Sequence, residues 1–293
     1  MRGTSSLWRR WELPTWGVTV AIYGSWTVLT LGWATVPIWV AVPAMGWLLA
    51  WHGSLQHETI HGHPTRNRWI NSSLGGVPLA IWLPYELYRS SHIVHHRDED
   101  LTIPAVDPES YYVPADDWMK ATGVTRALLV FNHTLLGRFT VGPAICLWRF
   151  YPAEMKALAR GEHVGAWILH LVPLAGVVAW LAWCGVPAWA YAIAVYLSIS
   201  ITMIRSFAEH KAAQEATGRT AVIEAAWPMA ILFLYNNLHA RHHARPDLPW
   251  FDLAAFHRSQ PEWKGLAYRG YTDVLGRFLW KPVDRPVRFM DLA

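Results

Sequence analysis

Residues 13–56 read LPTWGVTVAIYGSWTVLTLGWATVPIWVAVPAMGWLLAWHGSLQ and contain no Asp, Glu, Lys or Arg. A second stretch without these residues covers 164–204. Each stretch exceeds 40 residues, about twice the roughly 20 that one helix needs to cross a bilayer. Prolines and a glycine stand near both midpoints, where a turn is expected, at Pro37, Pro43, Gly185 and Pro187. The pattern predicts two helical hairpins, with spans at about 14–35, 38–56, 164–183 and 188–205.

The composition of the whole chain agrees with a membrane protein. Twenty of its 293 residues are tryptophan, and only 16% are charged, which is unusual for a soluble domain. The chain shows no internal repeat, so we predict one all-α integral membrane domain over residues 1–293. The segments outside the hairpins, 57–163 and 206–293, would form a helical cap on one side.

Two hairpins return the chain to the side that it left, and the basic residues support this topology. All 25 Lys and Arg lie outside the two uncharged stretches: three before the first, ten between them and twelve after the second. The short amino-terminal segment with Arg2, Arg9 and Arg10 carries the clearest orientation signal, because basic loops stay in the cytoplasm. We predict a multi-pass protein of the cell (inner) membrane with both termini cytoplasmic. The net charge of +4 favours lipid head groups over nucleic acid as its partner.

The histidines carry the chemistry. Eight of the fifteen fall into three groups, each at or just beyond an apolar segment, namely His57 and His61; His92, His95 and His96; and His239, His242 and His243. Spacings of three and four place side chains on one face of a helix. A zinc site takes at most four protein ligands, so eight convergent imidazoles indicate two metal ions. Imidazole suits Zn, Cu, Fe and Ni, so the ligands alone do not select the metal.

The three groups resemble the histidine boxes of a known family. The runs HETIH at 57–61, HIVHH at 92–96 and HARHH at 239–243 match the HxxxH, HxxHH and HxxHH boxes of the membrane fatty acid desaturase and hydroxylase superfamily. The resemblance extends to Asp107-Pro108-Glu109-Ser110 and to the segment RSFAEH, which ends at His210. It implies a ninth metal ligand at His210, and therefore the ligand set His57, His61, His92, His95, His96, His210, His239, His242 and His243.

The same resemblance implies the chemistry and the partners. It implies two iron ions as cofactor, dioxygen as co-substrate and a lipid or acyl substrate, with fatty acyl desaturation as the reaction. Hydroxylation of an acyl chain or another amphiphile is the alternative. The chain has only two cysteines and no haem or flavin motif, so a separate electron donor, a ferredoxin, rubredoxin or similar protein, is expected. We expect no catalytic side chain beyond the metal ligands.

Two readings from other classes compete. The run His57–His61 also matches HExxH, in which two histidines bind zinc and a glutamate, here Glu58, acts as general base in a metalloprotease. That reading leaves six box histidines without a role. A metal transporter would place ionisable groups inside the spans, where only His52 and His170 lie.

Some residues near the boxes have less certain roles. Metal-bound imidazoles need acceptors for their second nitrogen, and the candidates are Glu58, Asp98, Glu99, Glu209 and Asp247. In some animal acyl-CoA desaturases an asparagine four residues before the ninth histidine contacts a metal through water, whereas this chain has Ser206. His63 is a candidate auxiliary ligand, and His52 a candidate member of a longer first box. Asn236 and Asn237 are candidates to polarise a bound water, with helix capping or backbone bonding as the alternative.

Overall fold

The structure, a computed structural model, describes residues 7–97, 100–288 and 291. Arg2, Asp98 and Glu99 lie outside these residues. Most of the described chain is helical, as predicted. Strand is limited, in these residues, to two short parallel segments, β1 (Val222–Ile223) and β2 (Ala267–Tyr268).

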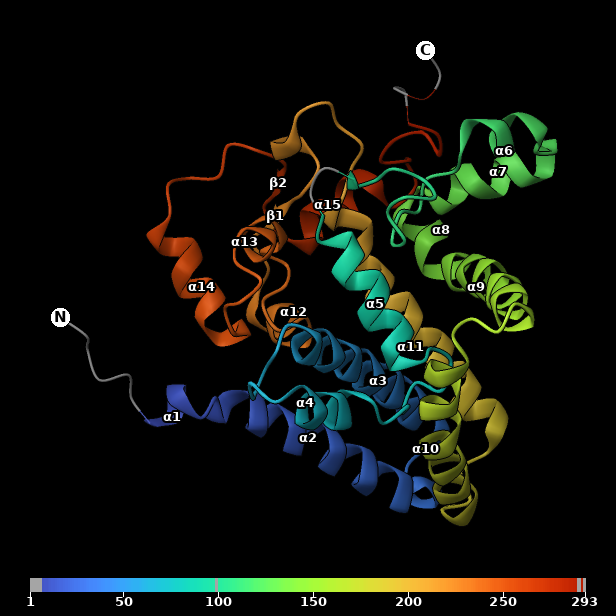
Figure 1. Cartoon of the computed structure of the whole chain (residues 1–293), viewed down its shortest axis with the longest axis vertical. Helices are drawn as coiled ribbons and strands as arrows, with labels where there is room; N and C mark the ends of the chain where they lie inside the picture. The colour runs from blue at the N-terminus through green and yellow to red at the C-terminus, as the bar shows by residue number, and fades with distance from the viewer. Residues whose placement is uncertain (1–6, 98–99, 289–290, 292–293) are drawn as a thin grey trace.

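Four long helices correspond to the four predicted spans. Helix α2 (Leu13–Leu31) leads through η1 (Trp33–Thr35) into α3 (Ile38–Ile60), and α10 (Val164–Trp183) leads into α11 (Ala188–Glu209), as Figure 1 shows. Within the described residues, α3, α10 and α11 are long and apolar enough to cross a membrane. Helix α2 is not among them: its 19 residues include four threonines and two glycines, which lower its hydropathy.

Helix α3 packs along α11 at the centre of the molecule. A Cβ atom at Gly46 would stand only 2.9 Å from the Cβ of Leu197, so glycine permits this close approach, as small residues do between membrane helices. Hydrogen bonds also join the two hairpins. The indole of Trp26 donates to the Tyr191 hydroxyl over 3.0 Å, and the indole of Trp180 donates to Thr30 over 2.9 Å.

Two helices run further than the sequence predicted. The predicted spans end at residues 56 and 205, but α3 continues to Ile60 and α11 to Glu209. Most of the added residues are buried, and several of them are polar, Glu58 and Glu209 among them. Protein contacts therefore cover these helix ends, and hydropathy does not mark where they stop.

A non-helical segment at 76–84 lies between α4 (Arg68–Gly75) and α5 (Tyr85–His95). Side chains of the long helices satisfy its backbone carbonyls: Tyr191 donates to Leu79 over 2.6 Å, and the His170 ring bonds Ile81 over 3.1 Å. Irregular backbone is tolerated at membrane depth only where protein covers it. These contacts hold the start of α5, which carries the second histidine group.

The remaining elements cover the ends of α3 and α11 away from their turns (Figure 1). They are α1 (Leu7–Arg10), α6 (Ala115–Lys120), α7 (Gly123–Asn132), α8 (Leu135–Thr140), α9 (Gly142–Ala159), η3 (Ala216–Gly218), α12 (Trp227–Leu232), α13 (His239–Ala244), α14 (Trp250–Ser259) and α15 (Tyr271–Phe278).

Candidate metal centre

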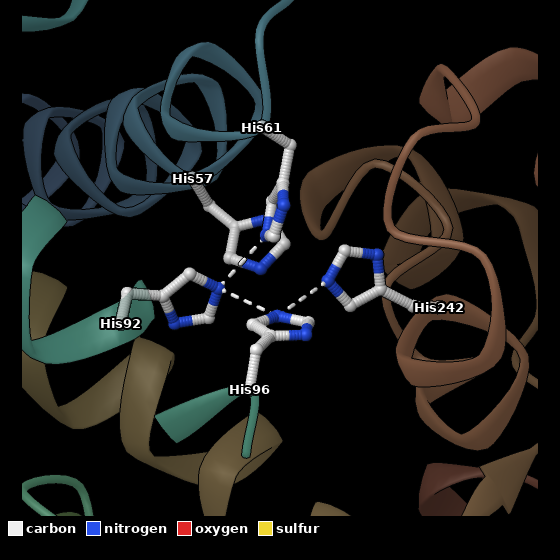
Figure 2. Close-up of side chains that lie close together, drawn as sticks. All are labelled: His57, His61, His92, His96 and His242. Atoms are coloured by element: carbon white, nitrogen blue, oxygen red, sulfur yellow. Dashed lines mark hydrogen bonds between the residues drawn. The ribbon is translucent and has the colours of Figure 1, made fainter. Parts of the chain in front are cut away.

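The structure brings together all nine histidines that the sequence singled out, in two clusters. The first cluster consists of His57, His61, His92, His96 and His242. Its candidate ligand atoms all lie within 4.8 Å of one another, and Figure 2 shows the five rings around a common centre. The rings come from α3, α5 and α13, segments that are far apart in the sequence.

The second cluster consists of His95, His210, His239 and His243. Its candidate ligand atoms also lie within 4.8 Å of one another. His210 directly follows α11, and the other three rings come from α5 and α13. Only His243 is half-buried, whereas the other three are buried.

Helical spacing explains how each HxxHH run serves both clusters. His92 and His96 are four apart and enter the first cluster, whereas His95 faces the second. On α13 the assignment is reversed, because His239 and His243 enter the second cluster and His242 the first. Helices α5 and α13 therefore each contribute rings to both clusters, and the clusters are adjacent, with the rings of His96 and His243 stacked at a centroid distance of 4.3 Å.

The hydrogen bonds of the second cluster suit a cation. Nδ1 of His95 donates to Asp107 over 2.9 Å, Nδ1 of His210 to the Arg219 carbonyl over 3.2 Å, and Nδ1 of His239 to Asn236 over 2.9 Å. A neutral imidazole carries one proton, so each Nε2 then holds a lone pair. Nε2 of His210 nevertheless lies 2.9 Å from Nε2 of both His95 and His239. Converging lone pairs without protons between them repel unless a cation binds them.

Ring nitrogens also approach one another closely in the first cluster. Nδ1 of His92 donates to Glu109 over 2.9 Å, which leaves a lone pair on its Nε2. That atom lies 2.9 Å from Nε2 of His61 and 3.1 Å from Nε2 of His96, and Nε2 of His242 is 3.2 Å from that of His96. The donor sets of both clusters therefore fit metal ions that imidazole prefers.

Burial keeps most of these rings neutral, the form that binds metal. Burial and the neighbouring imidazoles lower the pKa of His210, His239 and His242 well below the usual value. His95 differs: burial opposes its protonation, but the Glu109 and Asp107 carboxylates outweigh burial and raise its pKa to about 8. Burial likewise opposes ionisation of Glu109, but His95 and His92 lower the pKa of this carboxyl below its usual range.

The carboxylates beside the rings differ in part from the predicted ones. Glu209 was a predicted acceptor, but its Oε1 lies 3.4 Å from Nδ1 of His239 without a hydrogen bond, because that nitrogen bonds Asn236. Glu58 instead accepts the backbone N–H of Trp250 over 2.8 Å, and Asp247 pairs with Arg245. The acceptors of His95 and His92 are Asp107 and Glu109, which belong to the segment 107–110 that carries part of the family resemblance. Their place in that segment was the signal that could have found them.

The six other histidines have partners outside the two clusters. His63 bonds Glu12 over 2.8 Å, and His52 lies 3.3 Å from the Tyr23 hydroxyl. The others bond Asp284, Glu154, Ile81 and Glu224, through His133, His163, His170 and His257 respectively. Ser206 bonds the Met203 carbonyl and lines a small cavity next to His210.

Comparison with known proteins agrees with this arrangement. The profile of the fatty acid desaturase family matches residues 31–272. A chloroplastic omega-6 fatty acid desaturase of Brassica napus is 23% identical over 272 residues, 84% of this chain, and its counterpart from Arabidopsis thaliana is 23% identical over 275 residues, 85% of this chain. The chain spans 57% of the length of each of these relatives.

The long apolar helices lead to two adjacent histidine clusters. The chain is thus a helical protein with two neighbouring candidate metal sites and with apolar segments able to enter a membrane. The family match covers both clusters and three of the four long helices in full. The chain belongs to the fatty acid desaturase family.

Proposed function

We propose that this protein is an integral membrane oxidoreductase that uses two iron ions and dioxygen to desaturate a fatty acyl chain. The observation that carries the proposal is the convergence of nine imidazoles into two adjacent groups, in each of which the candidate ligand atoms lie within 4.8 Å of one another. The family match and the names of the plant relatives support the reaction class. Hydroxylation of an acyl chain is the second candidate, because the same ligands serve both outcomes.

The nine clustered histidines would hold the irons, five in the first cluster and four in the second. The chemistry that bound irons supply is the reductive activation of dioxygen, which attack on an unactivated methylene requires. The chain's own residues hold and orient the ligands: Asp107 and Glu109 accept ring protons and fix the tautomers of His95 and His92. Helix α3 packs against both α11 and α5, and most of the clustered rings are buried, so water has limited access to the clusters.

We further propose that α2 spans the membrane together with α3, α10 and α11, with both termini and the histidine clusters on the cytoplasmic side of the inner membrane. The two hairpins and the absence of charged residues from 13–56 and 164–204 support this topology. A soluble electron carrier, a ferredoxin or rubredoxin, would then reach the clusters from the cytoplasm. The acyl substrate would enter from the membrane side.

The zinc protease reading has less support. Its general base would be Glu58, but this carboxylate is buried and accepts the backbone N–H of Trp250 in α14. The neighbours of His57 and His61 are other imidazoles, from α5 and α13. Both features suit a polynuclear histidine site better than a single hydrolytic zinc.

Lipid analysis of a host that expresses the chain tests the proposal. Fatty acyl chains from cells with the wild-type protein are compared with those from cells with His95→Ala, which should reach the membrane at the same level. A new double bond in the wild type alone supports desaturation, and a new hydroxyl group supports the hydroxylase. Identical lipids in both cultures would contradict both activities if isolated membranes with the wild-type protein also form no product when reduced ferredoxin is supplied.

A further inference from the structure

One exposed face of helix α9 is apolar along its length. Trp148 is 81% exposed and Met155 is 69% exposed, although both side chains are large and apolar. Residues three and four apart share a helix face, and five exposed residues form a row with these spacings. The row consists of Ala144, Trp148, Tyr151, Met155 and Ala159. A continuous exposed apolar row marks an interaction surface, whereas single exposed apolar residues need no explanation.

A second exposed face of α9 is basic. Arg149 and Lys156 are exposed, and their spacing of seven places them on one side of the helix, two turns apart. Neither forms an ion pair in the part of the chain that the structure describes. Arg160 follows on the same side, but it pairs with Glu162 over 2.7 Å. The basic face lies about a third of a turn around the helix from the apolar row.

The third face of α9 packs on the start of α10. The Glu154 carboxylate accepts the Trp167 indole N–H over 3.2 Å and bonds the His163 ring over 3.0 Å, and the Phe150 ring lies 6.4 Å from that of Trp167. Helix α9 therefore lies across the amino-terminal end of α10, as Figure 1 shows. Ile168 is 57% exposed, so the apolar outer surface of this candidate span begins where α9 crosses it.

We propose that α9 lies in the surface of the cytoplasmic leaflet, with its apolar row among the acyl chains and with Arg149 and Lys156 bound to the head groups of anionic phospholipids. The inference rests on the membrane topology proposed above. Helices that lie in a membrane surface combine an apolar face with a basic face, and tryptophan is enriched at this depth. An acidic soluble partner would satisfy the two basic side chains but would leave Trp148 and Met155 in water.

Quenching by brominated lipids tests the position of α9 without relying on turnover. The full-length protein with Cys146→Ala and Cys184→Ala receives one cysteine, at Trp148→Cys, which carries a fluorophore. It is reconstituted into vesicles of phosphatidylcholine and phosphatidylglycerol with brominated acyl chains. A label at Val172→Cys, at a position of α10 that is 71% exposed, is the control for a lipid-facing site.

The matched control on α9 itself is Ala153→Cys, because Ala153 is also exposed but lies away from the apolar row. The label at position 148 should be quenched about as strongly as the label at 172, and the label at 153 much less. If Trp148→Cys does not fold, Met155→Cys on the same row takes its place and should give the same result.

Selection of the head group is measured by placing the bromine on only one of the two lipids. Brominated phosphatidylglycerol should quench the label at 148 up to about five-fold more than brominated phosphatidylcholine, because each basic residue near the surface contributes about 1 kcal/mol of attraction to anionic lipid. Arg149→Gln with Lys156→Gln should remove this preference. Arg160→Gln should change it little, because Glu162 already pairs with Arg160.

Several outcomes would overturn the inference. Weak quenching at 148 with strong quenching at 172, or equal quenching at 148 and 153, contradicts the immersion of the apolar row. A preference for phosphatidylglycerol that survives Arg149→Gln with Lys156→Gln contradicts the role of the basic face. Shielding of position 148 from both lipid and aqueous iodide would show that protein covers this face, from a second copy or a soluble partner. Absence of quenching at 172 would instead contradict the proposed topology itself.

Discussion

The two histidine clusters differ in ligands, charge and exposure. The first has five imidazoles, two of them half-buried, and one carboxylate hydrogen-bonded to a ring, Glu109 on His92. The second has four imidazoles, one of them half-buried, and one carboxylate hydrogen-bonded to a ring, Asp107 on His95, while Glu209 lies 3.4 Å from His239 without a hydrogen bond. Two carboxylates beside the rings attract a bound cation more strongly than one does. The second site should therefore hold its metal more tightly, and its smaller ligand set leaves more room for an exogenous ligand.

Removal of one ring should have the largest effect. His95→Ala leaves three imidazoles in the second cluster, and His242→Ala leaves four in the first. Both changes should abolish desaturation, because the reaction needs both metals, but His95→Ala should lose a full metal equivalent and His242→Ala only part of one. Product analysis and metal content of purified variants check this.

The control for the ring variants is His257→Ala. This ring pairs with Glu224, which is 62% exposed, and such exposed ion pairs contribute about 0–1 kcal/mol. The variant should keep its metals and most of its activity. Full activity in His95→Ala would contradict its assignment as a metal ligand. A loss of activity in His257→Ala equal to that in His95→Ala would contradict the separation of metal-binding from other histidines.

Chelation should empty the two sites in order. The half-buried rings of His61 and His96 give a chelator access to the first site, so that site should lose its metal first. Metal that binds only the folded state stabilises it by about 2.7 kcal/mol at 100 times its dissociation constant, so full removal should also lower Tm. Metal content and Tm followed against chelator concentration test this order, and release of both metals in one step would contradict it.

Loss of single carboxylates should have intermediate effects that separate the sites. Asp107→Asn removes the charge beside His95 and should weaken the second site about 10-fold, whereas Glu109→Gln should act mainly on the first. Co²⁺ titration of the two variants measures both affinities. Equal weakening of both sites in both variants would remove the distinction drawn between the clusters.

The smallest effect is expected at Glu58. Glu58→Gln keeps an oxygen that accepts the Trp250 N–H, and Glu58 belongs to neither cluster. Desaturation should remain near the wild-type level, with a small change in Tm. Loss of all activity with full metal content would instead support a role as catalytic base, as the protease reading requires.

The sequence predicted which histidines form the site, but it did not predict how they divide between two clusters. Spacings of three and four identified the box histidines, and the family resemblance added His210. The division into five and four was not predictable, because it depends on how α5 and α13 face each other in space. Asp107 lies in a loop without periodicity, so its place in the segment 107–110 was the signal for it, and its contact with His95 shows its role.

The fold shows a similar limit. The uncharged stretches predicted the four long helices. They did not predict that α3 and α11 continue by about one turn, so that α3 carries the candidate ligand His57 and α11 ends directly before the candidate ligand His210. Buried polar residues such as Glu209 end these helices inside protein. Hydropathy reports the contrast between lipid and water, so it gives no signal where one protein segment covers another.

The most direct test of the central claim is the metal content of the detergent-purified protein, with iron and zinc counted per chain by elemental analysis. The account predicts close to two irons per chain in the wild type, and clearly fewer in His95→Ala. One zinc and no iron would contradict it and would favour the hydrolytic reading of His57, Glu58 and His61.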